Sequence, residues 1–207
     1  MKPILFLYTT REGHTRRIAD HVEAFLKQRG LTVAARDVRS APADMDFSEF
    51  GAVFLAGPIH AGKHAPELMK LVKARAPELS KLPTAFLPVC LAQAGIENPQ
   101  TPTDKRAGAQ RAVQLLVDEF IGGTGFHPTR VKVIAGALPY TKYNFFIRWV
   151  MKRIVAKEGG DTDTTKDYVY TDWAELDRFV GSFLDECRTN PTSQMNAATA
   201  QAVVQPD

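Results

Sequence analysis

A short polar segment near the start of the chain has the residue types of an anion-binding loop. The segment TTREGHT (9–15) directly follows an apolar run and precedes a helical pattern. Amides at a helix N-terminus are unpaired and lie at the positive end of the helix dipole, and Gly13 would let the backbone approach an anion closely. Threonine hydroxyls would add uncharged donors. The spacing therefore predicts a phosphate site, with Thr9, Thr10, Arg11, Glu12, Gly13, His14 and Thr15 as its residues.

This loop favours a monophosphate over larger phosphate ligands. It lacks the lysine of a nucleoside-triphosphate loop and the three glycines of a dinucleotide fingerprint. A simpler interpretation is also open, because Thr15 alone could cap the helix without any ligand site. The pattern T-x-x-G-x-T does not by itself decide between the two.

Apolar runs alternate with helical patterns along the chain, which predicts an α/β protein. Continuous apolar strands separated by helices indicate a doubly wound, five-stranded parallel sheet, whose ligands bind at the carboxyl ends of the strands. One domain, residues 1–187, is expected, followed by a loose tail at 188–207. The expected strands are 4–8, 31–38, 52–57, 84–92 and 131–138, and the expected helices are 15–29, 66–76, 103–120 and 172–187.

Composition sets few limits on partners and favours a reducing compartment. The 207 residues carry a net charge of +3, which neither demands nor excludes a nucleic-acid partner, and none is predicted. Two cysteines, Cys90 and Cys187, make no disulfide framework. The apolar start is too short for a signal peptide, and no run approaches the ~20 residues of a membrane span. We expect a cytoplasmic protein, and the sequence leaves open whether it is a monomer or an oligomer.

Two levels of family resemblance follow from these motifs. The T-x-x-G-x-T loop and the rhythm of five strands resemble the flavodoxin fold, whose first loop binds the phosphate of FMN. The segments VIAGALPY (133–140) and GGDTDTTKDYVYTDW (159–173) resemble more specifically the flavodoxin-type, quinone-dependent protoporphyrinogen IX dehydrogenases of bacterial haem synthesis. The resemblance runs from residue 1 to about 185. It places an inserted segment, about 139–171, after the fifth strand.

The resemblance implies an FMN enzyme of haem (porphyrin) biosynthesis. Protoporphyrinogen IX would be oxidised to protoporphyrin IX, the flavin would accept hydride, and a membrane quinone would reoxidise the flavin. Residues 10–15 match the phosphate loop, and His60 is the candidate catalytic proton acceptor. The residues expected beside the flavin ring are Pro58, Ile59, His60, Ala61 and Gly62 after the third strand, and Leu91, Ala92 and Gln93 in a loop after the fourth.

Two other functions fit the same fold. The chain could be an electron-carrier flavodoxin without a substrate of its own, although such carriers are usually strongly acidic and lack residues equivalent to 139–171. It could also be an NAD(P)H:quinone reductase. No dinucleotide signature is visible, but in this fold none is required. The identity of the electron donor separates the three functions.

Histidines and aspartates elsewhere in the sequence resemble parts of metal sites, but their ligand sets are incomplete and we expect no metal site. His14, His60 and His64 lack a carboxylate or thiolate that would complete a ligand set, and Gly62 argues against a helix through them. The acidic segment at 161–167 has no glutamate at the twelfth position of a calcium loop. These aspartates are expected to form turns before the last helix, with Asp172 as its cap.

Residues 144–158 predict an amphipathic helix on a membrane surface. At 100° per residue, one arc is apolar: Ile147, Val150, Met151, Ile154 and Val155. The opposite arc mixes cations with aromatics and holds Phe145, Arg148, Trp149, Lys152 and Arg153. Because residues 140–158 carry five basic and one acidic side chain, we expect contact with an anionic membrane, at the inner face of the cell membrane. Packing of the helix on the domain or on a second subunit is the alternative.

Overall fold

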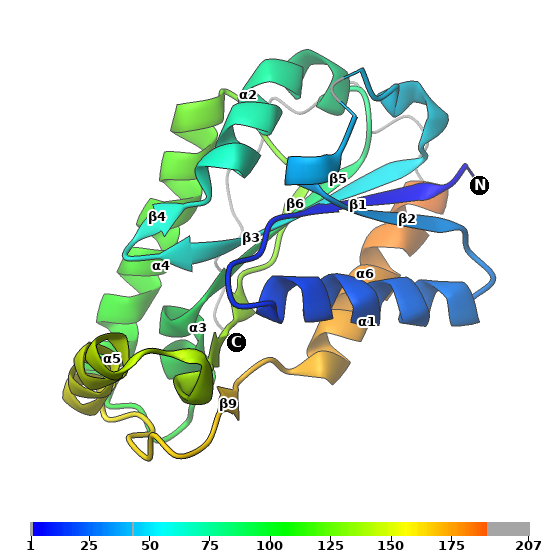
Figure 1. Cartoon of the computed structure of the whole chain (residues 1–207). Helices are drawn as coiled ribbons and strands as arrows, with labels where there is room; N and C mark the ends of the chain where they lie inside the picture. The colour runs from blue at the N-terminus through cyan, green and yellow to red at the C-terminus, as the bar shows by residue number, and fades with distance from the viewer. Residues whose placement is uncertain (1, 43, 190–207) are drawn as a thin grey trace.

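Five parallel strands form the centre of the protein. The computed structural model describes residues 2–42 and 44–189. The strands lie in the order β2-β1-β3-β5-β6, all parallel to their neighbours, so the predicted fold class is confirmed (Figure 1). Their bounds are β1 (Ile4–Tyr8), β2 (Val33–Asp37), β3 (Ala52–His60), β5 (Thr84–Cys90) and β6 (Arg130–Val131).

Helices cover both faces of this sheet, as its apolar strands require. In β1, Ile4 and Phe6 pack with α1 and α6, whereas Leu5 and Leu7 face α2 and α4 (Figure 1). Alternate side chains of a strand point to opposite faces, so a fully apolar strand needs cover on both. The helices are α1 (His14–Gln28), α2 (Pro66–Leu79), α3 (Leu91–Glu97), α4 (Thr103–Thr124), α5 (Phe145–Glu158) and α6 (Trp173–Thr189).

The segment after the fourth strand is a helix rather than the predicted loop. β5 ends at Cys90 instead of residue 92, and α3 begins at Leu91. The Gln93 amide donates to Glu97 Oε1 at 2.9 Å, four residues further on, which stabilises the helical turn. Leu91, Ala92 and Gln93 therefore lie at the start of a helix, partly buried.

The segment after the third strand forms a hairpin. β3 continues to His60 instead of ending at residue 57, and pairs antiparallel with β4 (Lys63–His64). Ala61 and Gly62 form the two-residue turn with φ of 48° and 71°. Such hairpin turns need positive φ at both positions, so Ala61 carries backbone strain there.

The predicted fifth strand, 131–138, is broken into three short pieces. β6 and β7 (Ile134–Ala135) pair with β5, but β8 (Ala137–Leu138) leaves the sheet and pairs antiparallel with β9 (Tyr168–Val169). At the break, a Cβ on Gly136 would lie 3.5 Å from the Cys90 carbonyl carbon, so the chain passes close to β5 there. The β8–β9 pair closes the base of the inserted segment.

The inserted segment packs around its own small apolar cluster. Tyr140 and Leu138 are almost fully buried there, with Val155 of α5 beside them and Tyr168 packed against the group. Leu91, at the start of α3, packs against the same cluster, so the insert lies beside the segment that follows β5 (Figure 1). The α6 helix extends to Thr189, two residues beyond the predicted boundary at 187. The predicted loose tail otherwise lies outside the described residues.

Candidate functional site

The loop between β1 and α1 has the backbone geometry of an anion site. Gly13 is the N-cap residue of α1, with φ of 93° and ψ of −6° and no side-chain cap. Its amide donates to Thr10 Oγ1 at 3.0 Å, which holds the loop in a tight turn. The alternative in which Thr15 caps the helix is wrong, because Thr15 lies inside α1 and is buried.

Several donors of this loop have no partner within the described protein. Arg17 donates the first amide bond of α1, to Gly13 O at 3.1 Å, so the amides of residues 14–16 have no acceptor inside the helix. The Thr9 hydroxyl is buried and has no hydrogen-bond partner in the described residues. An unsatisfied buried hydroxyl costs about 1–3 kcal/mol, so a ligand oxygen placed here would relieve that cost.

Gly57 leaves space beside this hydroxyl. A Cβ at Gly57 would lie 3.4 Å from Thr9 Oγ1 and 2.8 Å from Leu68 Cδ2. Because Thr9 also donates its amide to Ala56 O at 3.0 Å, the loop is tied to β3 at this point. The glycine, the unpaired hydroxyl and the free amides together suit an anionic group with several acceptor oxygens.

His14 is a neutral hydrogen-bond donor in this loop. The Thr171 hydroxyl donates to Ala135 O at 2.6 Å, so at 2.8 Å it must accept from His14 Nε2–H. Burial, followed by the charges of Arg17 and Lys142, lowers the pKa of His14 to about 4. The ring is therefore uncharged at pH 7, and Thr171 fixes its orientation.

Glu12 and His60 connect the phosphate loop with the β3–β4 hairpin. Their side chains meet at 3.0 Å, and both are partly buried. Burial raises the pKa of the Glu12 carboxyl, but the hydrogen bonds from His60 and the backbone, together with nearby positive charge, outweigh burial and leave that pKa below its usual value. Glu12 is therefore ionised at neutral pH and can orient the His60 ring through Nε2.

The inserted segment also reaches the phosphate loop. Lys142 Nζ donates to Glu12 O at 3.1 Å, across 130 residues of sequence. Tyr143 lies nearby, and burial together with the Glu12 charge raises its pKa to about 12. Neither Lys142 nor Thr171 was predicted as a site residue. Their contacts with residues 12 and 14 bring together parts of the chain that no local pattern connects.

The predicted ring-side residues lie at the same edge of the sheet as the phosphate loop. Tyr8 pairs with Ala56, and Pro58 pairs with Val89, so the segments that follow β1, β3 and β5 gather there. The hairpin residues differ in exposure: Pro58, Ile59 and His60 are partly buried, whereas Ala61 and Gly62 are exposed.

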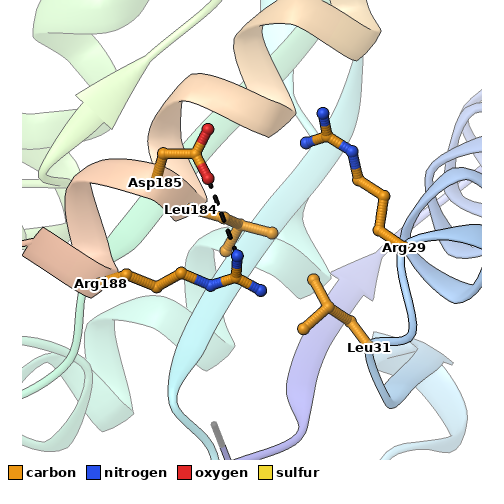
Figure 2. A pocket seen from close by; sticks show the side chains of 5 residues that line it. All are labelled: Arg29, Leu31, Leu184, Asp185 and Arg188. Carbon is orange, nitrogen blue, oxygen red and sulfur yellow. Dashed lines mark ion pairs between the residues drawn. The ribbon is translucent and has the colours of Figure 1, made fainter.

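The protein also has a hollow, which lies at a different end of the sheet from the phosphate loop. It has a volume of about 310 Å³ and lies where α1 turns into β2, against the end of α6. None of the predicted site residues lines it, and the residues that do are Arg29, Leu31, Leu184, Asp185 and Arg188 (Figure 2).

The three histidines considered above as metal ligands each contact a different residue. His14 contacts Thr171, His60 contacts Glu12, and His64 donates to Leu116 O at 2.7 Å. Over residues 2–42 and 44–189, no group of three or more His, Cys, Asp or Glu side chains is arranged to hold a metal ion.

The aspartates of the insert form hydrogen bonds within the insert itself. Asp167 accepts two bonds from Thr141, and Asp161 accepts one from the Tyr170 hydroxyl. Asp172 caps the last helix, as predicted, by accepting from Glu175 N–H at 2.9 Å.

The α5 helix presents an unusual apolar surface. It carries five of the seven large hydrophobic side chains that are exposed in the described chain: Phe145, Phe146, Ile147, Trp149 and Ile154. Phe145 is 84% exposed and Phe146 is 70% exposed, although Asn144 caps the helix normally through Ile147 N–H. Among the described residues no helix is both long and apolar enough to cross a membrane.

The predicted division of α5 into two arcs is partly wrong. Arg148 was expected among the outward cations, but it is partly buried and donates to Tyr140 O at 3.0 Å and Tyr143 O at 2.9 Å. Ile147 and Ile154 were expected on the packed arc, but they are exposed. The charge-assisted bonds from Arg148 to the carbonyls of the preceding turn hold this side chain inward, and Ile147 and Ile154 lie on the outer side of the helix. Lys152 and Arg153 remain outside, with the Arg153 guanidinium 4.7 Å from the Trp149 ring centre.

Comparisons with known proteins agree with this geometry. The model of the Flavodoxin domain family matches residues 5–165. A protoporphyrinogen IX dehydrogenase [quinone] of Escherichia coli (strain K12) is 32% identical over 178 residues, covering 85% of this chain and 91% of that protein. One of Leishmania major is 33% identical over 183 residues, covering 86% of this chain and 73% of that protein.

Among solved structures, a short-chain flavodoxin associated with a PDU bacterial microcompartment superposes with a TM-score of 0.53. It is 11% identical in sequence, and the match covers 90% of this chain and 99% of that one. At that identity the similarity is one of fold. The family match and the two relatives show more than a shared fold, because they cover most of this sequence. The chain therefore belongs to the flavodoxin domain family and, within it, to the family of the protoporphyrinogen IX dehydrogenases [quinone].

Proposed function

We propose that this protein oxidises protoporphyrinogen IX to protoporphyrin IX, with FMN as its bound cofactor and a membrane quinone as electron acceptor. The observation that carries the proposal is the contact between a monophosphate loop and the 139–171 insert, made by Lys142 and Thr171. An electron-carrier flavodoxin lacks such an insert. The names of the two relatives support the substrate and the acceptor.

The site has separate parts for the phosphate and for the ring of FMN. The phosphate meets the amides at the start of α1 and the buried Thr9 hydroxyl, which has no partner in the described residues. The ring would be held by residues 58–62 of the β3–β4 hairpin and residues 91–93 at the start of α3. When bound, FMN supplies a hydride acceptor.

His60 is the group that removes the proton accompanying hydride loss. Its Nε2 donates to the ionised Glu12, which leaves Nδ1 with a lone pair that can accept a proton. The Glu12 carboxylate then stabilises the imidazolium that forms. Glu12 acts as a positioning residue in this scheme, because it contacts His60.

The proposed phosphate site predicts that Gly13 controls how much FMN the purified protein contains. Gly13→Val should purify with little FMN, because the residue at φ 93° cannot keep the amides of the loop in place. Gly30→Val is the matched control, because Gly30 has φ of 72° at the other end of α1 and has open space around it. Both substitutions should destabilise the protein by about 1–2 kcal/mol, and only the first should empty the site. An unchanged ratio of FMN to protein in Gly13→Val would refute the placement.

The identity of the electron donor tests the function itself. In stopped-flow measurements on the purified holoprotein, we expect protoporphyrinogen IX to bleach the flavin absorbance and NADPH to leave it unchanged. A soluble quinone analogue should then restore the absorbance, and fluorescent protoporphyrin should accumulate. Reduction by NADPH alone would instead identify a reductase, and reduction by neither donor would identify an electron carrier.

The role of His60 is tested by its substitution in the same reaction. His60→Gln should keep its FMN and slow reduction of the flavin by about 100-fold, because the proton acceptor is lost. Glu12→Gln should slow the reaction less, because it changes only the orientation and the charge around His60. A wild-type rate in His60→Gln would mean that water accepts the proton.

The outer face of α5 is proposed to meet an anionic membrane surface. Phe145, Phe146 and Trp149 are exposed beside Lys152 and Arg153, a mixture that suits the interface between lipid headgroups and acyl chains. The residues outside 140–158 carry a net charge of about −1, so the positive charge is concentrated at this surface. A quinone in the bilayer would thereby come close to the carboxyl edge of the sheet.

Sedimentation with vesicles tests this surface. The wild-type protein should pellet with anionic liposomes and bind less at high salt, and Phe145→Ser combined with Trp149→Ser should weaken that binding. Leu115→Ser is the control, because Leu115 is 68% exposed but lies on α4. If the double variant pellets as the wild type does, the surface has another role. A change in its oligomeric state on gel filtration would then identify a second copy as the partner.

A further inference from the structure

Both ends of the insert contact the phosphate loop. Lys142, near the start of the insert, donates through Nζ to Glu12 O at 3.1 Å. Thr171, at its end, accepts from His14 Nε2 at 2.8 Å. These contacts join segments that are 130 and 157 residues apart in sequence. A segment that served only a substrate or a membrane would have no need of two anchors on this loop.

The ammonium group of Lys142 stands over the turn of the loop. Its Nζ lies 4.0 Å from the position that a Cβ on Gly13 would occupy. A lysine ammonium has three N–H donors, and the Glu12 carbonyl uses one of them, so two can be offered to another acceptor. Gly13 is followed at once by the free amides of α1, so an anion held there would also be within reach of Lys142.

The backbone around Lys142 is fixed by the rest of the insert. Its neighbour Thr141 donates both its amide and its hydroxyl to Asp167, at 2.9 and 3.0 Å. One residue before Thr141, Tyr140 is fully buried and its carbonyl accepts from Arg148. The side chain of Lys142 is exposed, but the backbone from which it extends is held in position.

The charges around the loop are arranged to favour an anion. Glu12 is the only acid in residues 9–15, and its carboxylate is turned towards His60. The pKa of His14 is lowered first by burial and then by the positive charges of Arg17 and Lys142, so these two cations add a positive potential at the loop. A doubly charged phosphate would experience the same potential as an attraction.

We propose that Lys142 is a phosphate clamp: the insert supplies this cation to the cofactor site, and the cation makes the protein prefer FMN to riboflavin, which lacks the phosphate. The proposal rests on the FMN site proposed above. It gives the insert a second role, because an insert-deleted protein would lose affinity for FMN along with its substrate contacts. Lys142 is a binding residue here and takes no part in the redox step.

Equilibrium titration of the apoprotein with FMN and with riboflavin tests the clamp, with quenching of flavin fluorescence as the signal. Lys142→Met should bind FMN about tenfold more weakly at low salt and bind riboflavin as the wild type does. We expect tenfold, about 1.4 kcal/mol, because Lys142 is exposed and water screens part of its charge. Lys142→Arg should keep most of the affinity, and the difference between wild type and Lys142→Met should shrink as salt is raised.

Lys166→Met is the matched control, because Lys166 is also in the insert but lies beside Asp163 and the Tyr168 ring. Its affinity for both flavins should equal that of the wild type. Equal affinity of wild type and Lys142→Met for FMN would overturn the clamp, and so would an equal loss of affinity for FMN and riboflavin. These titrations contain no porphyrinogen or quinone, so a failure of the proposed reaction would leave them unaffected. A wild-type protein that bound neither flavin would overturn both proposals.

Discussion

The rest of the site depends on the connection between the phosphate loop and the insert. Lys142 reaches the Glu12 carbonyl from one end of the insert, and Thr171 holds the His14 ring from the other. In this connection His14 donates through Nε2–H to the Thr171 hydroxyl, and its ring is neutral at pH 7. Through Glu12 the connection continues to His60 on the β3–β4 hairpin. Cofactor loop, insert and hairpin therefore form one hydrogen-bonded unit at the carboxyl edge of the sheet.

This arrangement also accounts for the unusual surface of α5. Arg148 lies inward because its guanidinium donates to the carbonyls of Tyr140 and Tyr143, and those carbonyls belong to the turn that carries Lys142. Fixing that turn fixes the rotation of α5 and leaves Phe145, Phe146 and Trp149 facing outward. The turn that carries Lys142, the cation that we propose for the cofactor site, is thus also bonded to the helix whose apolar face we propose for the membrane. Loss of Arg148 should affect both.

Most of the fold could be predicted from the sequence because its strands are short apolar runs buried on both faces. The glycine and threonine spacing identified the loop at Gly13, although the unpaired Thr9 hydroxyl emerged only from the packing around Gly57. Local patterns failed where a distant contact decided the outcome. The fifth strand breaks because Ala137–Leu138 pairs with Tyr168–Val169. Arg148 departs from the helical wheel through a nearer contact, with the carbonyls of the turn just before its own helix. Lys142 and Thr171 carried no local sign of a role at the loop.

Hydrogen exchange of the amide groups of the insert tests the central claim most directly. The amides of Lys142 and Tyr143 are bonded to Pro139 O and Tyr140 O, so their exchange reports how often this turn opens. If FMN binds the loop and the insert as one unit, FMN should slow exchange at residues 140–143 as well as at residues 9–15, and riboflavin should protect 140–143 much less. Protection of the loop by FMN with unchanged exchange at 140–143 would contradict the account.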